Sequence, residues 1–205
     1  MTQSNFGDDG NDGRADKLVT ITRSFVEDLH ERVPQSHAEQ VINSNASLRG
    51  DLLHQLPERF IQEHLIRDIA EEVLDYEYRS EPKGIDGLGG RIPDFEVMNA
   101  ETLTLGEIKK PNNIEQARSE SHKYIQMASS RPAIGISTDG WTWILHVARS
   151  GEGPIYHSHQ PLRPIIREIG REVRHSKPVR NRKLREKTAD FVRCFHRQTL
   201  SEIVQ

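Results

Sequence analysis

The residues best suited to chemistry lie in two short apolar runs, 92–98 and 103–109, joined by polar, turn-forming residues. This pattern is typical of a β-hairpin. When the two runs pair as antiparallel strands about the turn, Asp94 lies opposite Glu107 on one face. Lys109 lies two residues beyond Glu107 and therefore joins the same face. Two carboxylates and one ammonium group are thus expected to converge at one end of the hairpin.

Two carboxylates held this close repel each other unless a cation lies between them. Hard divalent cations such as Mg²⁺ bind carboxylate oxygens, backbone carbonyls and water. Such an ion lowers the pKa of bound water and stabilises negative charge on a phosphodiester in its transition state. Lys109 could orient the attacking water or stabilise the developing charge. The alternative is a surface hairpin on which Glu107 and Lys109 form a simple ion pair.

The Pro-Asp at 93–94, followed by Glu107-Ile108-Lys109 at a strand end, resembles the PD-(D/E)XK nuclease superfamily. The resemblance implies that Asp94, Glu107 and the backbone carbonyl of Ile108 bind Mg²⁺ or Mn²⁺. It also implies that Lys109 assists the attacking water.

A helix is predicted over residues 56–76, because its apolar residues form one broad face that must be buried. Glu58 falls near the middle of that face, where a carboxylate needs a partner. The sequence around it resembles the N-terminal nuclease domain of type I restriction motor subunits, in which an early helix adds a carboxylate to the metal site. This resemblance points to Glu58, with Glu63 as the substitute. Alternatively, Glu58 only complements the positive N-terminal end of the helix.

Further elements follow the hairpin in an order that predicts an α/β fold. A helix is expected over residues 113–129, with Gln116, Glu120 and Tyr124 along one stripe at a spacing of four. A buried strand over 132–137, an Asp-Gly turn and a tryptophan-containing strand come next. Together they predict a restriction-endonuclease-like core with a mixed central β-sheet flanked by helices.

The flanking segments divide the chain into four predicted parts. Residues 1–15 are expected to form a disordered leader, 16–50 an N-terminal helical cap, 51–150 the nuclease core and 151–205 a basic helical C-terminal extension. His157 and His159 are expected to lie in a loop of the last part.

Charge divides along the chain in the same way as these parts. From residue 161 onward there are 12 Lys and Arg against 5 Asp and Glu, whereas the whole chain has a net charge of −3. Basic residues recur there at helical spacing, namely Arg163, Arg167, Arg171 and Arg174. They predict contacts with nucleic-acid phosphates. The alternative is a solvated helix face that balances the acidic front half.

These patterns predict an endonuclease that uses Mg²⁺ or Mn²⁺ to hydrolyse DNA, and the resemblance suggests a restriction or defence role. DNA is the expected partner, with a homodimer or a larger restriction-type assembly also expected. The alternatives are a catalytically silent DNA-binding or assembly protein on the same fold, a repair or junction nuclease, and an enzyme acting on RNA. No apolar stretch is long enough to cross a bilayer, and the single cysteine, Cys194, favours a reducing cytoplasm.

Overall fold

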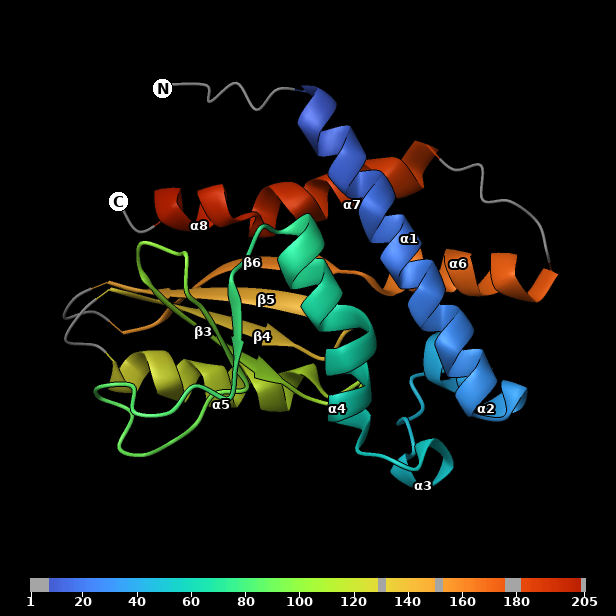
Figure 1. The fold of residues 1–205 in the computed structure, drawn as a ribbon, viewed down its shortest axis with the longest axis horizontal. Coiled ribbons are helices and arrows are strands. Elements are labelled where there is room, and N and C mark those ends of the chain that lie inside the picture. The colour runs from blue at the N-terminus through green and yellow to red at the C-terminus, as the bar shows by residue number, and fades with distance from the viewer. Residues whose placement is uncertain (1–7, 129–131, 150–152, 176–181, 204–205) are drawn as a thin grey trace.

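The computed structural model describes residues 8–128, 132–149, 153–175 and 182–203 and shows an α/β fold (Figure 1). Within these residues six strands form one sheet in the order β1-β2-β3-β4-β5-β6. The strands are β1 (Tyr78–Ser80), β2 (Phe95–Val97), β3 (Leu103–Ile108), β4 (Ala133–Thr138), β5 (Thr142–Ala148) and β6 (Ile155–Pro161). Strands β3 and β4 are parallel because a helix connects them, and the other neighbours are antiparallel. The predicted mixed sheet is therefore confirmed.

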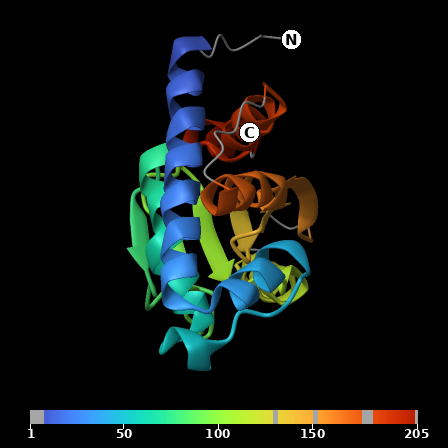
Figure 2. The same cartoon turned by 90° about the vertical axis from the view of Figure 1, so that its right-hand side faces the viewer.

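Helices cover both faces of this sheet, as the sequence predicts (Figures 1 and 2). They are α1 (Asp8–Arg32), α2 (Gln35–Asn43), α3 (Gly50–Leu53), α4 (Pro57–Ile61), η1 (Gln62–Ile66), η2 (Ile69–Val73), α5 (Ile114–Met127), α6 (Arg163–His175), α7 (Arg182–Phe195) and α8 (Arg197–Ile203). The predicted helix over 56–76 is present as α4, η1 and η2, two of whose segments have the wider π-helical turn. Among the described helices, none is long and apolar enough to span a membrane.

The hairpin of β2 and β3 has the register expected from the sequence. Glu96 pairs with Leu105 and Phe95 pairs with Gly106, so the next pair outward is Asp94 and Glu107. Gly106 is required here, because a Cβ atom at this position would overlap the Phe95 ring. The hairpin therefore depends on one glycine directly before the candidate catalytic glutamate.

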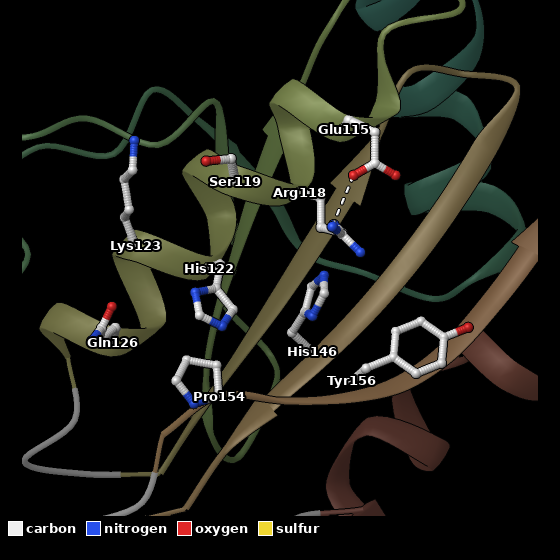
Figure 3. Close-up of a pocket in the computed structure, with 9 residues that line it drawn as sticks. All are labelled: Glu115, Arg118, Ser119, His122, Lys123, Gln126, His146, Pro154 and Tyr156. Carbon is white, nitrogen blue, oxygen red and sulfur yellow. Dashed lines mark ion pairs between the residues drawn. The ribbon is translucent and has the colours of Figure 1, made fainter.

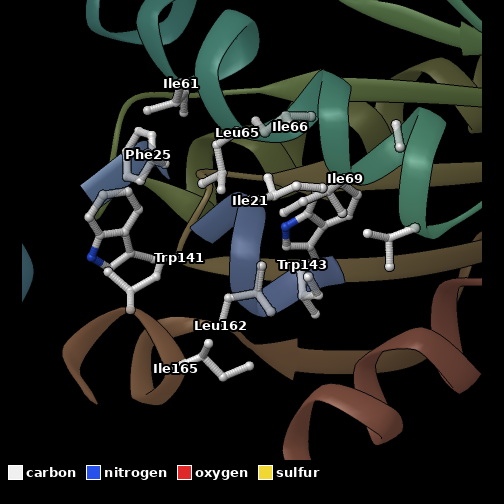
Figure 4. Close-up of a cluster of buried hydrophobic side chains, with 14 of the residues drawn as sticks. Ile21, Phe25, Ile61, Leu65, Ile66, Ile69, Trp141, Trp143, Leu162 and Ile165 are labelled. Carbon is white, nitrogen blue, oxygen red and sulfur yellow. The ribbon is translucent and has the colours of Figure 1, made fainter. Parts of the chain in front are cut away.

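The two faces of the sheet bury different clusters. One face carries alternating apolar side chains such as Phe95, Ile108 and Trp143, which pack against α1, the α4–η2 helix, α6 and α7. Figure 4 shows this cluster, in which Phe25 of α1 meets Trp141 edge to face at 5.7 Å between ring centroids. The opposite face lies under α5, where Leu105 packs with Tyr124. The carboxylate of Glu107 belongs to this second face.

The terminal segments complete the first cluster. Helix α1 begins at Asp8, so the predicted disordered leader is wrong from that residue onward, and residues 1–7 lie outside the described part of the chain. Leu18 of α1 is fully buried, since α1 packs against α6, α7 and η2. At the other end, Phe191 and Phe195 of α7 pack on Trp143 at 5.4 and 5.8 Å between centroids. The predicted cap and extension are thus parts of one core.

The predicted loop with two histidines is also wrong. His157 and His159 lie in β6, which pairs with β5 at the edge of the sheet and is largely exposed. A polar edge strand of this kind lacks the apolar run by which buried strands are found in a sequence.

Candidate functional site

The hairpin brings Asp94, Glu107 and Lys109 together on the face covered by α5. The Ile108 backbone N–H donates a hydrogen bond to Asp94 Oδ2 at 2.6 Å. Lys109 Nζ forms an ion pair with Glu107 Oε1. The Lys109 backbone N–H donates to the Thr138 carbonyl at 2.9 Å, which keeps this end of β3 attached to β4. Glu107 therefore lies within β3, and Asp94 and Lys109 lie directly beside the ends of β2 and β3.

Helix α5 adds a carboxylate that the sequence analysis did not assign to the site. Glu120 Oε2 lies 2.8 Å from Lys109 Nζ, so one ammonium group bridges two carboxyl groups. Gln116 Nε2 donates to Glu120 Oε1 at 3.1 Å and fixes its orientation. The stripe of Gln116, Glu120 and Tyr124 at a spacing of four was the signal that could have identified Glu120.

The N-terminal end of α5 is positioned by the turn between β4 and β5. Asp139 is buried and accepts hydrogen bonds from the backbone N–H groups of Trp141 and Thr142 at 3.0 and 2.8 Å. Its second oxygen accepts the Asn113 N–H at 3.1 Å, directly before the helix. Gly140 closes the turn with a φ of 78°, as the Asp-Gly pair predicts. This turn therefore ties the sheet to the helix that carries Glu120.

The pKa values in this cluster are strongly perturbed. Burial, contact with the Glu120 carboxyl and repulsion by Asp94 raise the pKa of Glu107 to about 8, against the pull of Lys109. Burial also raises the pKa of Asp94. Contact with Glu107 and hydrogen bonds from Lys109 and Gln116 lower the pKa of Glu120 to about 2. Burial alone would lower the pKa of Lys109, but its bonds to the two glutamates raise it. If all three carboxyl groups were ionised, their negative charge would exceed the single positive charge of Lys109.

The long helix α4–η2 brings Glu58, and not Glu63, to the edge of this cluster. Glu58 Oε1 accepts a hydrogen bond from the Lys110 backbone N–H at 3.3 Å, and its charge helps to raise the pKa of Asp94. Glu63 is exposed and forms an ion pair with Arg59 at 2.8 Å, one helical turn away. Of the two candidate helix carboxylates, Glu58 is the one that contacts the chain beside the hairpin residues.

The donor set fits a hard divalent cation in its chemistry. Glu107 is 3% exposed, and its Oε2 is buried with no hydrogen-bond partner in the described structure. Asp94 and Glu120 lie near Glu107, and Glu58 lies near Asp94, so the carboxyl oxygens are of the type that such ions prefer. Over the described ranges, however, no group of three or more His, Cys, Asp or Glu side chains is arranged as a metal site. Ile108 supplies an N–H to Asp94, and the metal-binding role of its carbonyl stays a prediction.

The basic face of α6 is occupied by contacts within the protein. Arg163 donates to Asn45 Oδ1 at 2.6 Å and to Asn112 Oδ1. Arg167 donates to the Ile42 and Asn43 carbonyls at 3.3 and 2.9 Å, and Arg174 pairs with Glu39 at 3.1 Å. Arg171 pairs with Glu168 in its own helix. Three of the four arginines therefore bind α2 or residues near it, which favours the structural interpretation of the basic stripe over phosphate binding.

Comparison with known proteins finds no match to this chain among protein families, curated proteins or solved structures. The function of this chain is therefore inferred from its residues and their geometry.

Proposed function

We propose that this protein is a metal-dependent endonuclease that hydrolyses DNA phosphodiester bonds on a restriction-endonuclease-like core. The observation that carries the proposal is the buried Glu107 carboxyl, which lies against Lys109 and shares one face with Asp94. One Glu107 oxygen has no partner in the described structure, and its pKa is raised to about 8. Such perturbed groups are concentrated at catalytic sites.

A divalent cation bound by these carboxylates would supply an activated water and stabilise charge on the phosphate. The residues themselves prepare that chemistry. The Ile108 N–H holds Asp94 in a fixed orientation. Glu107, with its proton lost to solvent, would offer carboxylate oxygens to the cation. Lys109 can then turn from the glutamates towards the phosphodiester, where an ammonium group stabilises developing negative charge. Glu58 is placed to add a ligand from the helix side.

One observation favours a second candidate function, a catalytically silent DNA-binding or assembly protein. Lys109 already bonds to both Glu107 and Glu120, so its ammonium group takes the place that a cation would occupy between the carboxylates. In that case the ion pairs would stabilise the fold and no cation would enter. Within the nuclease proposal, restriction or defence and repair or junction cleavage are the two biological roles that we carry forward.

Cleavage assays with purified protein separate these candidates. Supercoiled plasmid, branched DNA oligonucleotides and structured RNA are incubated with Mg²⁺, Mn²⁺ or EDTA. We expect metal-dependent cutting of DNA and a loss of about a hundredfold or more in the Asp94→Asn variant. Asp86→Asn, an exposed acid in the neighbouring loop, is the matched control and should keep full activity.

Three outcomes would contradict the proposal in different ways. Binding of DNA without cutting of any substrate would establish the silent candidate. Cutting that persists in Asp94→Asn would place the active site elsewhere. Cutting of RNA alone would change the substrate class.

A further inference from the structure

A polar pocket lies on the other side of α5 from the carboxylate cluster. Its volume is about 650 Å³, and it is lined by α5, by β5 and by residues at and before the start of β6 (Figure 3). Arg118 and His122 line this pocket, whereas Glu120 and Tyr124 face the hairpin. At about 100° per residue, Arg118 and Glu120 project about 200° apart, so the helix separates the two sites. No residue of the carboxylate cluster takes part in this pocket.

His146 is the polar group at the base of the pocket. Its side chain is 3% exposed, and Nε2 is buried with no hydrogen-bond partner in the described structure. Burial, followed by repulsion from His122 and Arg118, lowers the pKa of His146 to about 4, so the ring is neutral at pH 7. A neutral imidazole offers one donor and one acceptor. An unpaired buried nitrogen lowers stability, and a ligand that supplies its hydrogen bond removes this cost.

Two further rings flank His146 and suit a planar ligand. Figure 3 shows His146 between His122 of α5 and Tyr156 of β6. The ring centroids of His122 and Tyr156 lie 6.1 and 6.2 Å from that of His146, at steep angles. Tyr156 is 55% exposed, unusually open for a tyrosine at a pocket wall. An exposed aromatic face of this kind can stack on a nucleobase.

The rim of the pocket carries positive charge. Lys123 is exposed and has no ion pair among the described residues. Arg118 pairs with Glu115 at 2.9 Å, but both side chains are more than half exposed, and surface pairs of this type are weak. Both cations are therefore available to an anionic group such as a phosphate.

We infer that this pocket binds a nucleotide unit, with its base against Tyr156 and its phosphate at Lys123 and Arg118. His146 would then read the polar edge of the base. The same chemistry occurs in a free mononucleotide and in an unpaired nucleotide of a DNA strand. The second source rests on the proposed function, whereas the first does not.

Fluorescence polarisation in EDTA tests this inference with cutting suppressed. A labelled single-stranded dT oligonucleotide is titrated with the protein, and thymidine monophosphate serves as competitor. Tyr156→Ala should weaken binding by about tenfold, and Lys123→Ala should weaken it several-fold at low salt. Ile155→Ala is the matched control, because Ile155 is 50% exposed on the same strand and does not line the pocket.

NMR of the histidine ring protons gives a second measurement that does not depend on any variant. The His146 signals should shift as thymidine monophosphate saturates the pocket. Competition by the mononucleotide would identify a free nucleotide as ligand, and binding of the oligonucleotide alone would identify a strand. If neither binds, or if Tyr156→Ala behaves like Ile155→Ala, the inference is wrong. Pocket binding without any metal-dependent cutting would overturn only the proposed nuclease function.

Discussion

Glu107 occupies an environment that opposes its ionisation. It is buried beside the carboxyls of Asp94 and Glu120, and Lys109 compensates only part of this negative charge. Burying a charged group without full compensation costs stability, and the group responds by retaining its proton. The ionised form of Glu107 therefore lowers the stability of the folded protein, and a bound cation would offset this loss. This loss can be measured without any knowledge of the substrate.

Our first prediction concerns stability against pH. The pKa of Glu107 rises from 4.5 to about 8 on folding. Below pH 4.5 the group is protonated in both states, so its favourable contribution is fully present. That contribution is lost as the pH rises from 4.5 to about 8. Over this range the free energy of unfolding falls by at most about 1.4 kcal/mol per pH unit. Urea unfolding of the wild type and Glu107→Gln between pH 5 and pH 8, in EDTA, measures the difference.

The variant should gain stability relative to the wild type as the pH rises, because glutamine carries no proton to lose. Glu120 has its pKa lowered to about 2, so its contribution is lost only as the pH falls below 4.5, outside the measured range. Repeating the series with Mg²⁺ should stabilise the wild type most at pH 8. A difference between the two proteins that stays constant with pH would contradict the burial argument for Glu107.

The second prediction separates the two helix glutamates. Glu58→Gln should lower metal-dependent cutting by about tenfold to a hundredfold, since residues that support a metal site have effects of this size. Glu63→Gln should leave cutting unchanged, because Glu63 is exposed and forms its ion pair with the exposed Arg59. Initial cleavage rates against Mg²⁺ concentration provide the measurement. Equal losses in the two variants would remove Glu58 from the site.

At the scale of single residues, local periodicity predicted the hairpin carboxylates. The alternation of a strand places Asp94, Glu107 and Lys109 on one face without any long-range information. Glu120 was not predicted as a site residue, because its contact with Lys109 depends on how α5 packs across the sheet. The choice between Glu58 and Glu63 likewise needed the rotation of a helix about its axis, which π-helical turns change.

At the scale of elements, burial decided what the sequence could predict. Strands β4 and β5 are buried, so their apolar runs were predicted within one or two residues. Strand β6 was predicted as a loop because it is an exposed edge strand whose residues 157–160 are histidine, serine and glutamine. The hairpin register was predicted because a shift by one residue would have turned Phe95 away from the core.

The third prediction tests how tightly this hairpin is packed. Gly106→Ala places a methyl group into the Phe95 ring and should destabilise the protein by about 1–3 kcal/mol or more. Adding Phe95→Leu should recover part of the loss, because the two positions share one space. Gly13→Ala in α1 is the control, since nothing lies within 4 Å of a Cβ there. Phe95→Leu alone completes the cycle. Thermal melts of the five proteins give the comparison, and additive losses would contradict direct contact.

At the scale of the whole molecule, one core joins segments from both ends of the chain. The main cluster includes Leu18 near the start and Leu200 near the end. The Tyr76 hydroxyl donates to the Phe195 carbonyl, and the Arg197 N–H donates to the Leu74 carbonyl at 3.0 Å. Composition and charge suggested separate parts because they describe the surface of α6 and α7, whereas their buried faces belong to the sheet.

The fourth prediction follows from this shared core. A fragment of residues 51–150, which is the predicted nuclease core, lacks Phe25, Phe191 and Phe195, and all three pack on the two tryptophans. Losing aromatic packing of this kind costs about 3–5 kcal/mol per large side chain, comparable in sum with the stability of a whole domain. The fragment should therefore show no cooperative unfolding, and its tryptophan emission should be shifted to the red.

A chain of residues 8–203 keeps every described element and should melt like the full-length protein. If the fragment instead unfolds cooperatively and cuts DNA, then the terminal helices are additions to a core that is stable alone, as composition first suggested.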